Sequence, residues 1–194
     1  MDLKGKKIIL ASASPRRKEL LAGLNIEFEI DTLNGFDESY DPLLPQKEIP
    51  SALSEGKSLG FHRELLDNEI LITADTLVLC EGRIMGKPKN RADAIDMLKH
   101  LSGKTHEVVT AITLRDSKHY KTLSDTSIVH FKKLSEKEIE YYVDEYKPMD
   151  KAGAYGIQEW IGYIGIPMIE GSFFTIMGFP THLVYSLLLD FINS

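Results

Sequence analysis

Short apolar runs alternate along this chain with segments of helical periodicity, and this alternation limits the possible folds more than any other feature. The apolar runs occupy residues 7–11, 26–30, 70–74, 77–79, 107–115, 122–131 and 163–169. Apolar side chains recur at helical spacing in residues 15–24, 51–66, 92–101, 135–146 and 179–192. Strands that alternate with helices favour an α/β fold. We therefore predict a mixed central sheet with flanking helices.

Residues that begin and end helices support these assignments. Ser14 precedes Pro15, a pattern typical of an N-cap followed by the first helical residue. Gly23 suits the end of that helix. Ser135 with Glu138 three residues later predicts a capping box at the start of another helix.

The segment between the second strand and the second helix has a different composition. Residues 34–50 are rich in Asp, Glu, Pro and Gly and are predicted to be a loop. The helical pattern of residues 51–66 is interrupted by Gly56 and Gly60. Neither this loop nor any other segment is a linker long enough to separate independent domains. At 194 residues, the chain is expected to be a single domain over residues 1–194, with one or two lobes.

Charge and composition exclude several classes of protein. Lys and Arg number 23 and Asp and Glu number 29, so the net charge is −6. A non-specific nucleic-acid binder normally carries the opposite balance, and we expect no nucleic-acid partner. No apolar run approaches the ~20 residues of a membrane span, and the run at residues 8–10 is too short for a signal peptide. The single Cys80 excludes an intramolecular disulfide and suits a reducing cytoplasm.

Two segments imitate the end of a phosphate-binding P-loop. They are Gly56-Lys57-Ser58 and Gly103-Lys104-Thr105. That loop needs another glycine five positions earlier, where this chain has Ser51 and Leu98. Both matches therefore fail.

Residues 12–17 combine hydroxyls with two arginines at a predicted helix start. Ser12 and Ser14 precede Arg16 and Arg17. Free backbone N–H groups and the helix dipole favour an anion at such an end, and guanidinium groups bind phosphate oxygens bidentately. The alternative is a capped helix with a solvated basic first turn. Because arginine opposes the helix dipole there, the anion site is a serious hypothesis.

Further charged side chains stand in other predicted loops and strand ends. Asp75 follows an apolar strand, where open α/β sheets place ligands, and is a candidate metal ligand or base. Its alternative is a turn residue or a partner for Lys87, which lies in the segment Gly86-Lys87-Pro88. Glu38 in the acidic loop could join Asp75 in supplying the oxygen ligands that Mg²⁺ prefers. Its alternative is a solvated loop carboxylate.

The last candidate segment is glycine-rich, at residues 150–158. Its small residues permit close approach to a ligand, and Gln158 offers both a donor and an acceptor for reading a base edge. The alternative is an ordinary flexible turn. Together the candidates suit Mg²⁺-assisted attack of water on a phosphoanhydride. An anion-binding module without chemistry would have a similar sequence.

Several motifs of this chain together resemble those of one protein family. The chain resembles the Maf family of nucleoside triphosphate pyrophosphatases in a series of blocks that keep the family's order along nearly the whole chain. The blocks are Ile9 to Arg17, Ala74-Asp75-Thr76, Gly86-Lys87-Pro88, Leu101-Ser102-Gly103 with His106, Asp150 to Gln158, and Gly171-Ser172 followed by Gly178-Phe179-Pro180. Phe179 and Phe174 depart conservatively from the Leu and Tyr that are more usual in the family.

The resemblance implies an inosine triphosphatase-like fold, with two lobes around a cleft and a mixed central sheet. It implies hydrolysis of a nucleoside triphosphate to the monophosphate and pyrophosphate with a divalent cation, Mg²⁺ or Mn²⁺. Arg-Arg after Ser-Pro is similar to the branch that acts on dTTP and UTP, which removes unwanted or non-standard nucleotides. The family is also associated with inhibition of septum formation, so a nucleotide-binding regulator without essential turnover is the alternative. A homodimer is the family's usual state.

The resemblance also implies roles for individual residues. Asp75 takes the position of the catalytic proton acceptor, and Glu38 with Asp75 completes the metal site. Phosphate binding and charge stabilisation fall to Ser12, Ser14, Arg17, Lys57 and Lys87. Substrate choice falls to Arg16, Thr76 and Gln158.

Overall fold

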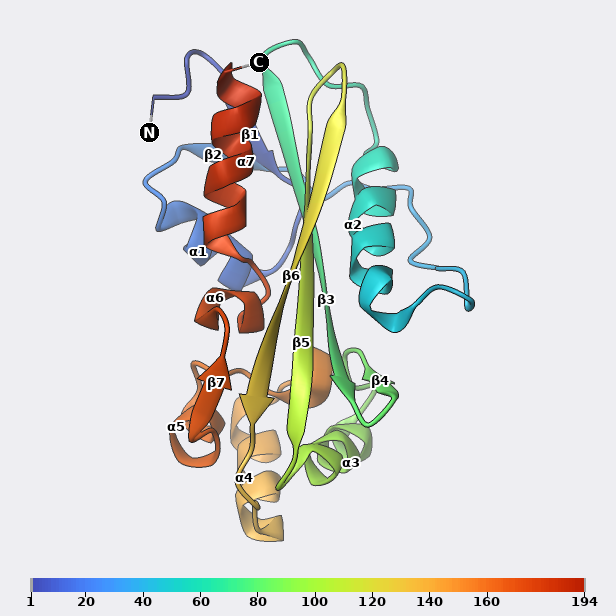
Figure 1. The fold of residues 1–194 in the computed structure, drawn as a ribbon, viewed down its shortest axis with the longest axis vertical. Helices are drawn as coiled ribbons and strands as arrows, with labels where there is room; N and C mark the ends of the chain where they lie inside the picture. The colour runs from blue at the N-terminus through green and yellow to red at the C-terminus, as the bar shows by residue number, and fades with distance from the viewer. Residues whose placement is uncertain (1, 194) are drawn as a thin grey trace. The chain divides into compact units, whose positions relative to one another are not determined.

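The computed structural model describes residues 2–193, and its strands form one mixed sheet (Figure 1). The strands are β1 (Lys7–Leu10), β2 (Phe28–Ile30), β3 (Glu69–Cys80), β4 (Arg83–Met85), β5 (Thr105–Arg115), β6 (Tyr120–His130) and β7 (Met168–Glu170). Their order is β2-β1-β3-β5-β6-β7, and β4 pairs with β3. β1 is parallel to β2 and β3, whereas β4 and β7 run antiparallel to β3 and β6. The predicted mixed sheet is confirmed.

Helices flank the sheet strands, as the sequence predicted. They are α1 (Pro15–Ala22), α2 (Ile49–Leu59), α3 (Arg91–Leu101), α4 (Glu136–Tyr146), α5 (Trp160–Gly165), α6 (Phe173–Ile176) and α7 (Thr181–Asn193), with single 3-10 turns at Gln46–Glu48 and Ala152–Ala154. The capping box of α4 is present in full, with Ser135 and Glu138 each bonding the other's backbone N–H. Within residues 2–193, no helix is long and apolar enough to cross a membrane.

Two segments differ from the sequence prediction. The helix predicted over residues 51–66 begins at Ile49 and ends at Leu59, because Gly60 caps it and the chain then turns away. Residues 163–169 were predicted as a strand, but residues 163–165 belong to α5 and the strand begins only at Met168. Apolar residues fit a buried helical turn as well as a strand, so periodicity over so short a run does not separate the two.

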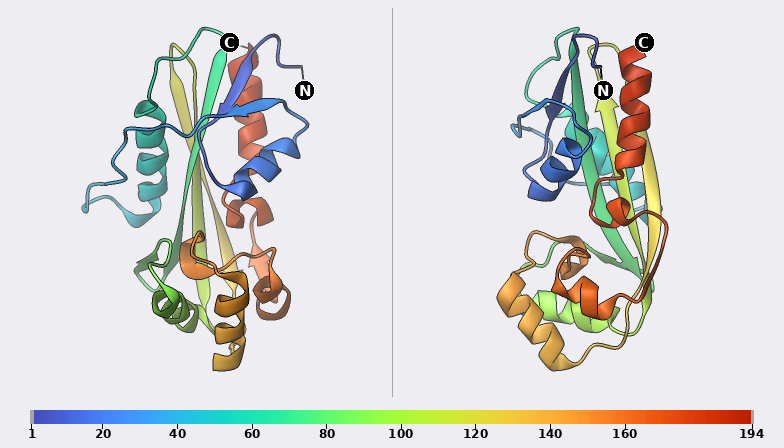
Figure 2. Two further views of the ribbon diagram at one scale, coloured as in Figure 1. Left: turned by 180° about the vertical axis from the view of Figure 1, so that it is seen from behind. Right: turned by 90° about the vertical axis from the view of Figure 1, so that its left-hand side faces the viewer.

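The chain divides into two compact units, and β3, β5 and β6 contribute residues to both. The first unit comprises residues 1–75, 110–125 and 178–194. Here α1 and α7 cover one face of β1 and β3, and α2 lies over the other face (Figures 1 and 2). Side chains point alternately to the two faces of each strand. Ile70 and Ile72 pack with residues of α1 and α7, whereas Leu71 packs with Phe61 and Leu65, which follow α2 in the chain.

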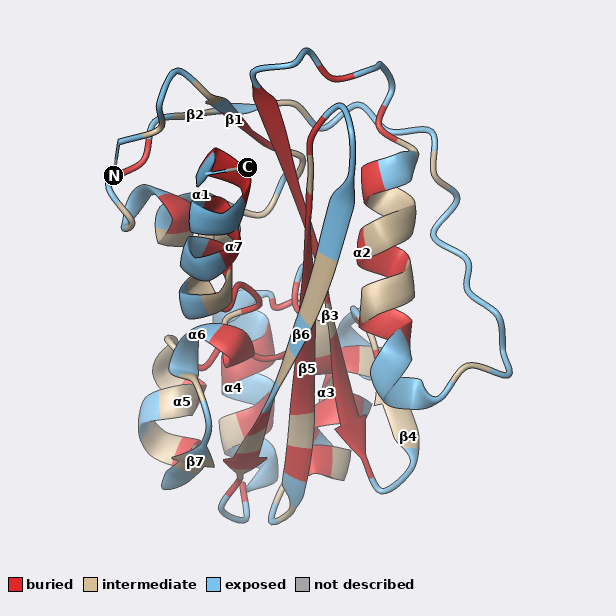
Figure 3. Cartoon of the chain, turned by 45° about the horizontal axis from the view of Figure 1, so that its top comes forward, coloured by how far each residue is buried: buried red, intermediate tan, exposed pale blue. Residues whose placement is uncertain are grey.

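The second unit comprises residues 76–109 and 126–177. Its core gathers apolar side chains from the second half of β3, from β4, and from α3 and α4, which pack side by side in Figure 2. Tyr142 of α4 is fully buried in this core, together with Leu98 of α3 and Met85 of β4. Figure 3 shows β3 and β5 buried along nearly their whole length, whereas the loop before α2 and the first half of β6 are exposed.

Candidate active site

Asp75 lies in the middle of a strand and not at its end. β1 stops at Leu10, which pairs with Ile72, and the N–H of Ala11 still bonds the Ile72 carbonyl at 2.9 Å. β3 continues through Asp75 to Cys80 and pairs with β4 there. The prediction that Asp75 ends its strand is therefore wrong. The strand continues through the polar residues Asp75 and Thr76 into the second apolar run, at residues 77–79. Asp75 instead lies just beyond the carboxyl end of the neighbouring parallel strand.

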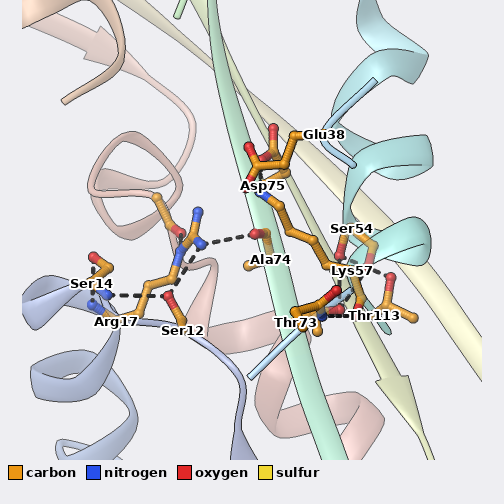
Figure 4. Close-up of polar contacts among 12 residues, drawn as sticks. Ser12, Ser14, Arg17, Glu38, Ser54, Lys57, Thr73, Ala74, Asp75 and Thr113 are labelled. Atoms are coloured by element: carbon orange, nitrogen blue, oxygen red, sulfur yellow. Dashed lines mark hydrogen bonds and ion pairs between the residues drawn. The ribbon is translucent and has the colours of Figure 1, made fainter. Parts of the chain in front are cut away.

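Asp75 faces α2, and an ammonium group from that helix meets it there. Side chains alternate along β3, so Asp75 shares the face of Leu71 and Thr73. The Nζ atom of Lys57 lies 2.6 Å from Oδ1 of Asp75 and 3.2 Å from Oε1 of Glu38 (Figure 4). Only 12% of the Asp75 side chain is exposed, against 65% of the Glu38 side chain. The structure thus brings together three predicted site residues, Asp75 from a strand, Lys57 from a helix and Glu38 from a loop.

A chain of buried hydroxyl groups fixes α2 on the sheet beside this cluster. Oγ of Ser54 lies 2.9 Å from Oγ1 of Thr113, and the Thr73 hydroxyl donates to the Ser54 carbonyl at 2.8 Å (Figure 4). Thr113 in turn lies 2.9 Å from the hydroxyl of Thr122. Sequence reasoning missed these residues, although buried hydroxyls inside apolar strands were a visible signal. They attach the helix that carries Lys57 to the strand that carries Asp75.

Arg17 is held by carbonyl groups that are remote in sequence. Its Nη1 donates to the carbonyl of Ala74 at 2.8 Å, and its Nε donates to the carbonyl of Gly178 at 3.0 Å. Its Nη1 also lies 3.4 Å from Oγ of Ser12 (Figure 4). Burial lowers the pKa of the Arg17 guanidinium, and the negative charge of Asp75 opposes that effect. Arg17 is therefore a fixed cation whose charge acts on Asp75.

The start of α1 has the form that the sequence predicted. Ser14 is the N-cap, Pro15 opens the helix, and Oγ of Ser14 accepts the Arg17 N–H at 3.5 Å. The first turn contains no acidic side chain, while Arg16 and Arg17 both lie in it. The positive charge of Arg16 further lowers the pKa of Arg17. Two cations at the positive end of a helix dipole create a local field that favours an anion.

Three predicted site residues belong to the second unit. Thr76 follows Asp75 on β3 and points to the opposite face. Lys87 is exposed and follows Gly86, whose carbonyl accepts the Gly153 N–H at 3.0 Å. Gln158 lines a cavity of about 340 Å³. Its Oε1 atom is buried without a hydrogen-bond partner among the residues that the structure describes.

The Tyr142 hydroxyl contacts residues on both sides of Gln158. Its hydroxyl accepts the Gly156 N–H at 2.9 Å and donates to the Glu159 carboxylate. Lys151 pairs with Glu159 at 3.1 Å. Burial, and then the contact with Glu159, raises the pKa of the Tyr142 hydroxyl far above its ordinary value, so the hydroxyl keeps the proton that it donates. Sequence reasoning missed Tyr142 because it lies in an unrelated helical pattern.

Two carboxylates of the first unit could contribute oxygen ligands to a divalent cation. Asp75 and Glu38 present carboxylate oxygens to one cationic position, now occupied by the ammonium of Lys57. Within residues 2–193, no group of three or more His, Cys, Asp or Glu could hold a metal ion. Mg²⁺ is commonly bound through one or two carboxylates plus substrate phosphates, without an all-protein cage. Two carboxylates beside fixed cations match that arrangement.

A mixed α/β fold with carboxylates, a lysine and an arginine around one strand suits a protein that binds phosphate groups. Comparison with known families makes this class of protein specific. The family described as Maf-like protein matches residues 7–191. The chain belongs to the Maf family.

Individual relatives are similar along nearly their whole length. The chain is 50% identical to a protein of Bacteroides thetaiotaomicron over 92% of this chain and 93% of that one. It is 47% identical to a protein of Porphyromonas gingivalis strain W83, over 98% and 96% of the two chains. It is 48% identical to a protein of Christiangramia forsetii, over 99% and 97%. Each of these relatives is named dTTP/UTP pyrophosphatase.

Proposed function

We propose that this protein is a nucleoside triphosphate pyrophosphatase that hydrolyses dTTP and UTP to the monophosphate and pyrophosphate. The observation that carries the proposal is the joined cluster of Asp75, Lys57 and Glu38, in a chain that matches relatives of that name over at least 92% of its length. A regulator of septum formation without turnover would need the nucleotide contacts but not this cluster of base and cation.

Asp75 is proposed as the proton acceptor. In the proposed step a water molecule attacks the α-phosphorus, and the bond from that phosphorus to the oxygen that bridges to the β-phosphorus is broken. The proton of that water passes to Asp75, whose carboxylate is buried and held at one oxygen by Lys57. Pyrophosphate then leaves with the electron pair of the broken bond.

Cations of the first unit are proposed to hold the phosphates. Lys57 carries three N–H donors on a flexible stem, so it can contact both carboxylates and a phosphate oxygen. Arg17 is fixed by two carbonyls and supplies a charge that needs no reorganisation during the reaction. Ser12 and Ser14 offer hydroxyls at the same helix start. Lys87 is proposed as a further phosphate ligand.

Asp75 and Glu38 are proposed to hold the divalent cation, Mg²⁺ or Mn²⁺. When bound, the cation would neutralise phosphate charge and lower the pKa of a coordinated water. Removal of divalent ions with EDTA should abolish turnover, and added Mg²⁺ should restore it. Full activity in excess EDTA would exclude a metal role for Glu38 and Asp75.

Gln158, with Arg16 and Thr76, is proposed to select the base. Uracil and thymine present an N–H donor between two carbonyl acceptors, and one amide can pair with the N–H and an adjacent carbonyl. Cytosine has an unprotonated ring nitrogen and an amino group at those positions. The same amide orientation cannot satisfy both patterns.

The test compares kcat/KM for dTTP, UTP, CTP and dGTP in the wild type and in Gln158→Ala. A buried polar mismatch costs about 1–3 kcal/mol, so UTP should exceed CTP by about 5–150-fold in the wild type. The alanine variant should lose most of that preference. Equal use of CTP by the wild type, or an unchanged ratio in the variant, would exclude Gln158 from base selection.

Three further features belong to the proposal. Residues 1–194 act as a single catalytic domain, which is supported by a family match that spans both compact units. The protein works on a small-molecule nucleotide in the cytoplasm. It forms a homodimer, and light scattering of the purified protein would measure that state.

A further inference from the structure

α2 contains a glycine where a helix former would be expected. Gly56 lies in the interior of Ile49–Leu59, and Gly60 caps the end of the helix. Glycine is among the poorest helix formers, and it is tolerated inside a helix mainly where something must approach the backbone closely. Neither glycine takes part in the proposed chemistry. Their position four residues apart places both on one side of the helix.

Phe36 occupies the space that these glycines leave open. A Cβ atom on Gly56 would overlap the ring atoms Cζ, Cε1 and Cε2 of Phe36. A Cβ atom on Gly60 would lie 2.7 Å from Cβ of Phe36 and 2.9 Å from Oδ1 of Asn34. Within residues 32–43, Phe36 is the one residue that is not exposed. The Phe36 ring therefore lies against a helix surface from which side chains are missing.

Backbone bonds attach the same loop to the end of α2. The Gly35 N–H donates to the Gly60 carbonyl at 2.9 Å, and Nδ2 of Asn34 donates to the Lys57 carbonyl at 2.5 Å. Oδ1 of Asn34 accepts the Phe36 N–H at 2.8 Å. The loop is thereby fixed to the turn of helix that carries Lys57.

Glu38 lies two residues after Phe36, and its partner Lys57 follows Gly56 directly. The carboxylate of Glu38 is largely exposed, and its contact with Lys57 at 3.2 Å is a surface ion pair. Such pairs hold a flexible side chain weakly. A half-buried aromatic ring two residues away, packed against Gly56 and Gly60, provides the fixed point that the ion pair lacks.

We propose that Phe36, seated on Gly56 and Gly60, is a positioning residue that holds Glu38 at the cation site and so sets the affinity for the divalent metal. This inference rests on the proposed function. It assigns to two glycines and one phenylalanine a role in metal binding that their own chemistry does not suggest.

The test introduces Gly56→Ala and measures Mn²⁺ binding by titration calorimetry. The full chain is first saturated with a UTP analogue whose α and β phosphorus atoms are joined by a methylene group. Loss of support behind a metal ligand typically weakens metal binding about 10–100-fold, and we expect a Kd increase in that range. Because alanine is the better helix former, the thermal midpoint should not fall by enough to explain the loss. Amide hydrogen exchange of residues 35–40 should become faster.

Two companion variants sharpen the result. Ser51→Ala is the matched control, an alanine on the same helix away from Phe36, and its Kd should equal that of the wild type. Phe36→Ala should weaken Mn²⁺ binding as Gly56→Ala does. Adding Gly56→Ala to Phe36→Ala should then have no further effect, because the clash has lost its partner.

The possible failures are distinguishable through Glu38→Gln. If Glu38→Gln raises the Kd and Gly56→Ala does not, the positioning role is wrong and the proposed function stands. If Glu38→Gln leaves the Kd unchanged, both the metal role of Glu38 and this inference are wrong. Additive effects of Phe36→Ala and Gly56→Ala on the Kd would also overturn this inference. If the two residues act through one contact, the first substitution already removes that contact and the second can have no further effect.

Discussion

One ammonium group contacts both carboxylates of the candidate site, and this contact determines how single substitutions there should behave. Lys57 meets Asp75 at 2.6 Å and Glu38 at 3.2 Å. Asp75 is the more buried of the two carboxylates and lies on a central strand, whereas Glu38 lies on an exposed loop. Substitutions of Asp75 are therefore expected to affect catalysis, and substitutions of Glu38 the metal requirement.

Asp75→Asn keeps the shape of the side chain but removes its charge and its ability to accept a proton. We expect kcat for dTTP to fall by about 10²–10⁴-fold, the usual result of losing a general base. Thermal unfolding should change little, since the amide still accepts a hydrogen bond from Lys57.

The matched control is Asp116→Asn in the turn between β5 and β6. Asp116 is also buried, and its carboxylate accepts the N–H groups of Lys118 and His119 at 2.8 and 2.9 Å. That variant should lose stability and keep kcat. Near-normal kcat in Asp75→Asn would show that Asp75 is a structural residue.

His106 predicts how stability changes with pH. It is 2% exposed, its Nε2 lies 2.8 Å from the Tyr155 hydroxyl, and burial lowers its pKa to about 3. The folded protein therefore keeps His106 neutral as the pH falls, whereas the unfolded chain binds a proton near pH 6.5. Stability should fall below pH 6.5, by up to about 2 kcal/mol at pH 5 from this residue.

Urea unfolding at pH 7 and pH 5 measures this effect. The loss of unfolding free energy between the two pH values should be larger in the wild type than in His106→Gln, which has no titrating ring. The comparison cancels the contributions of the other histidines. Equal losses in the two proteins would mean that His106 binds its proton equally well in the folded state.

At the scale of elements, the sequence predicted correctly those helix starts at which all the capping residues are present. Ser14 and Pro15 begin α1, and Ser135 with Glu138 begins α4, as predicted. These capping contacts act within four residues, so the sequence alone determines where the two helices begin. The length of α2 depended instead on contact with a separate loop, at Phe36. The short apolar run at residues 163–169 did not distinguish the end of α5 from a strand.

The capping box of α4 gives a prediction at this scale. The backbone N–H and hydroxyl of Ser135, together with Lys132, lower the pKa of Glu138 to about 2. Ser135→Ala should reduce the free energy of unfolding by about 0.5–2 kcal/mol at pH 7. Since the folded pKa of Glu138 is below its unfolded value, its share of the stability is present above about pH 4.5 and is lost as the pH falls toward about 2.

Denaturant unfolding of the wild type and Glu138→Gln at several pH values checks the sign. The difference between them should be full at pH 7 and should shrink below about pH 4.5. A difference that grows on acidification would contradict the capping interpretation. Neither variant should change kcat, because α4 supplies no group to the proposed chemistry.

At the scale of the whole molecule, the candidate site shows which information a sequence lacks. The residue types at the site could be named from motifs, but their partners could not. Arg17 is held by the carbonyls of Ala74 and Gly178, 57 and 161 residues away. Every residue has a backbone carbonyl, so a pattern of side chains cannot predict which carbonyls an arginine will contact. Lys57 was a candidate only through family resemblance, and its bridging position between two carboxylates required the fold. Asp75 was singled out from its motif but was wrongly placed at a strand end.

The central claim is that water attacks the α-phosphorus of dTTP and UTP at this site and that pyrophosphate is the leaving group. The most direct test is hydrolysis of dTTP by purified protein with Mg²⁺ in water enriched in ¹⁸O, with analysis of all products. We predict equal amounts of dTMP and pyrophosphate, with the ¹⁸O atom in dTMP, and formation of both products slower by about 10²–10⁴-fold in Asp75→Asn. Release of orthophosphate with dTDP, or ¹⁸O found in pyrophosphate, would contradict it.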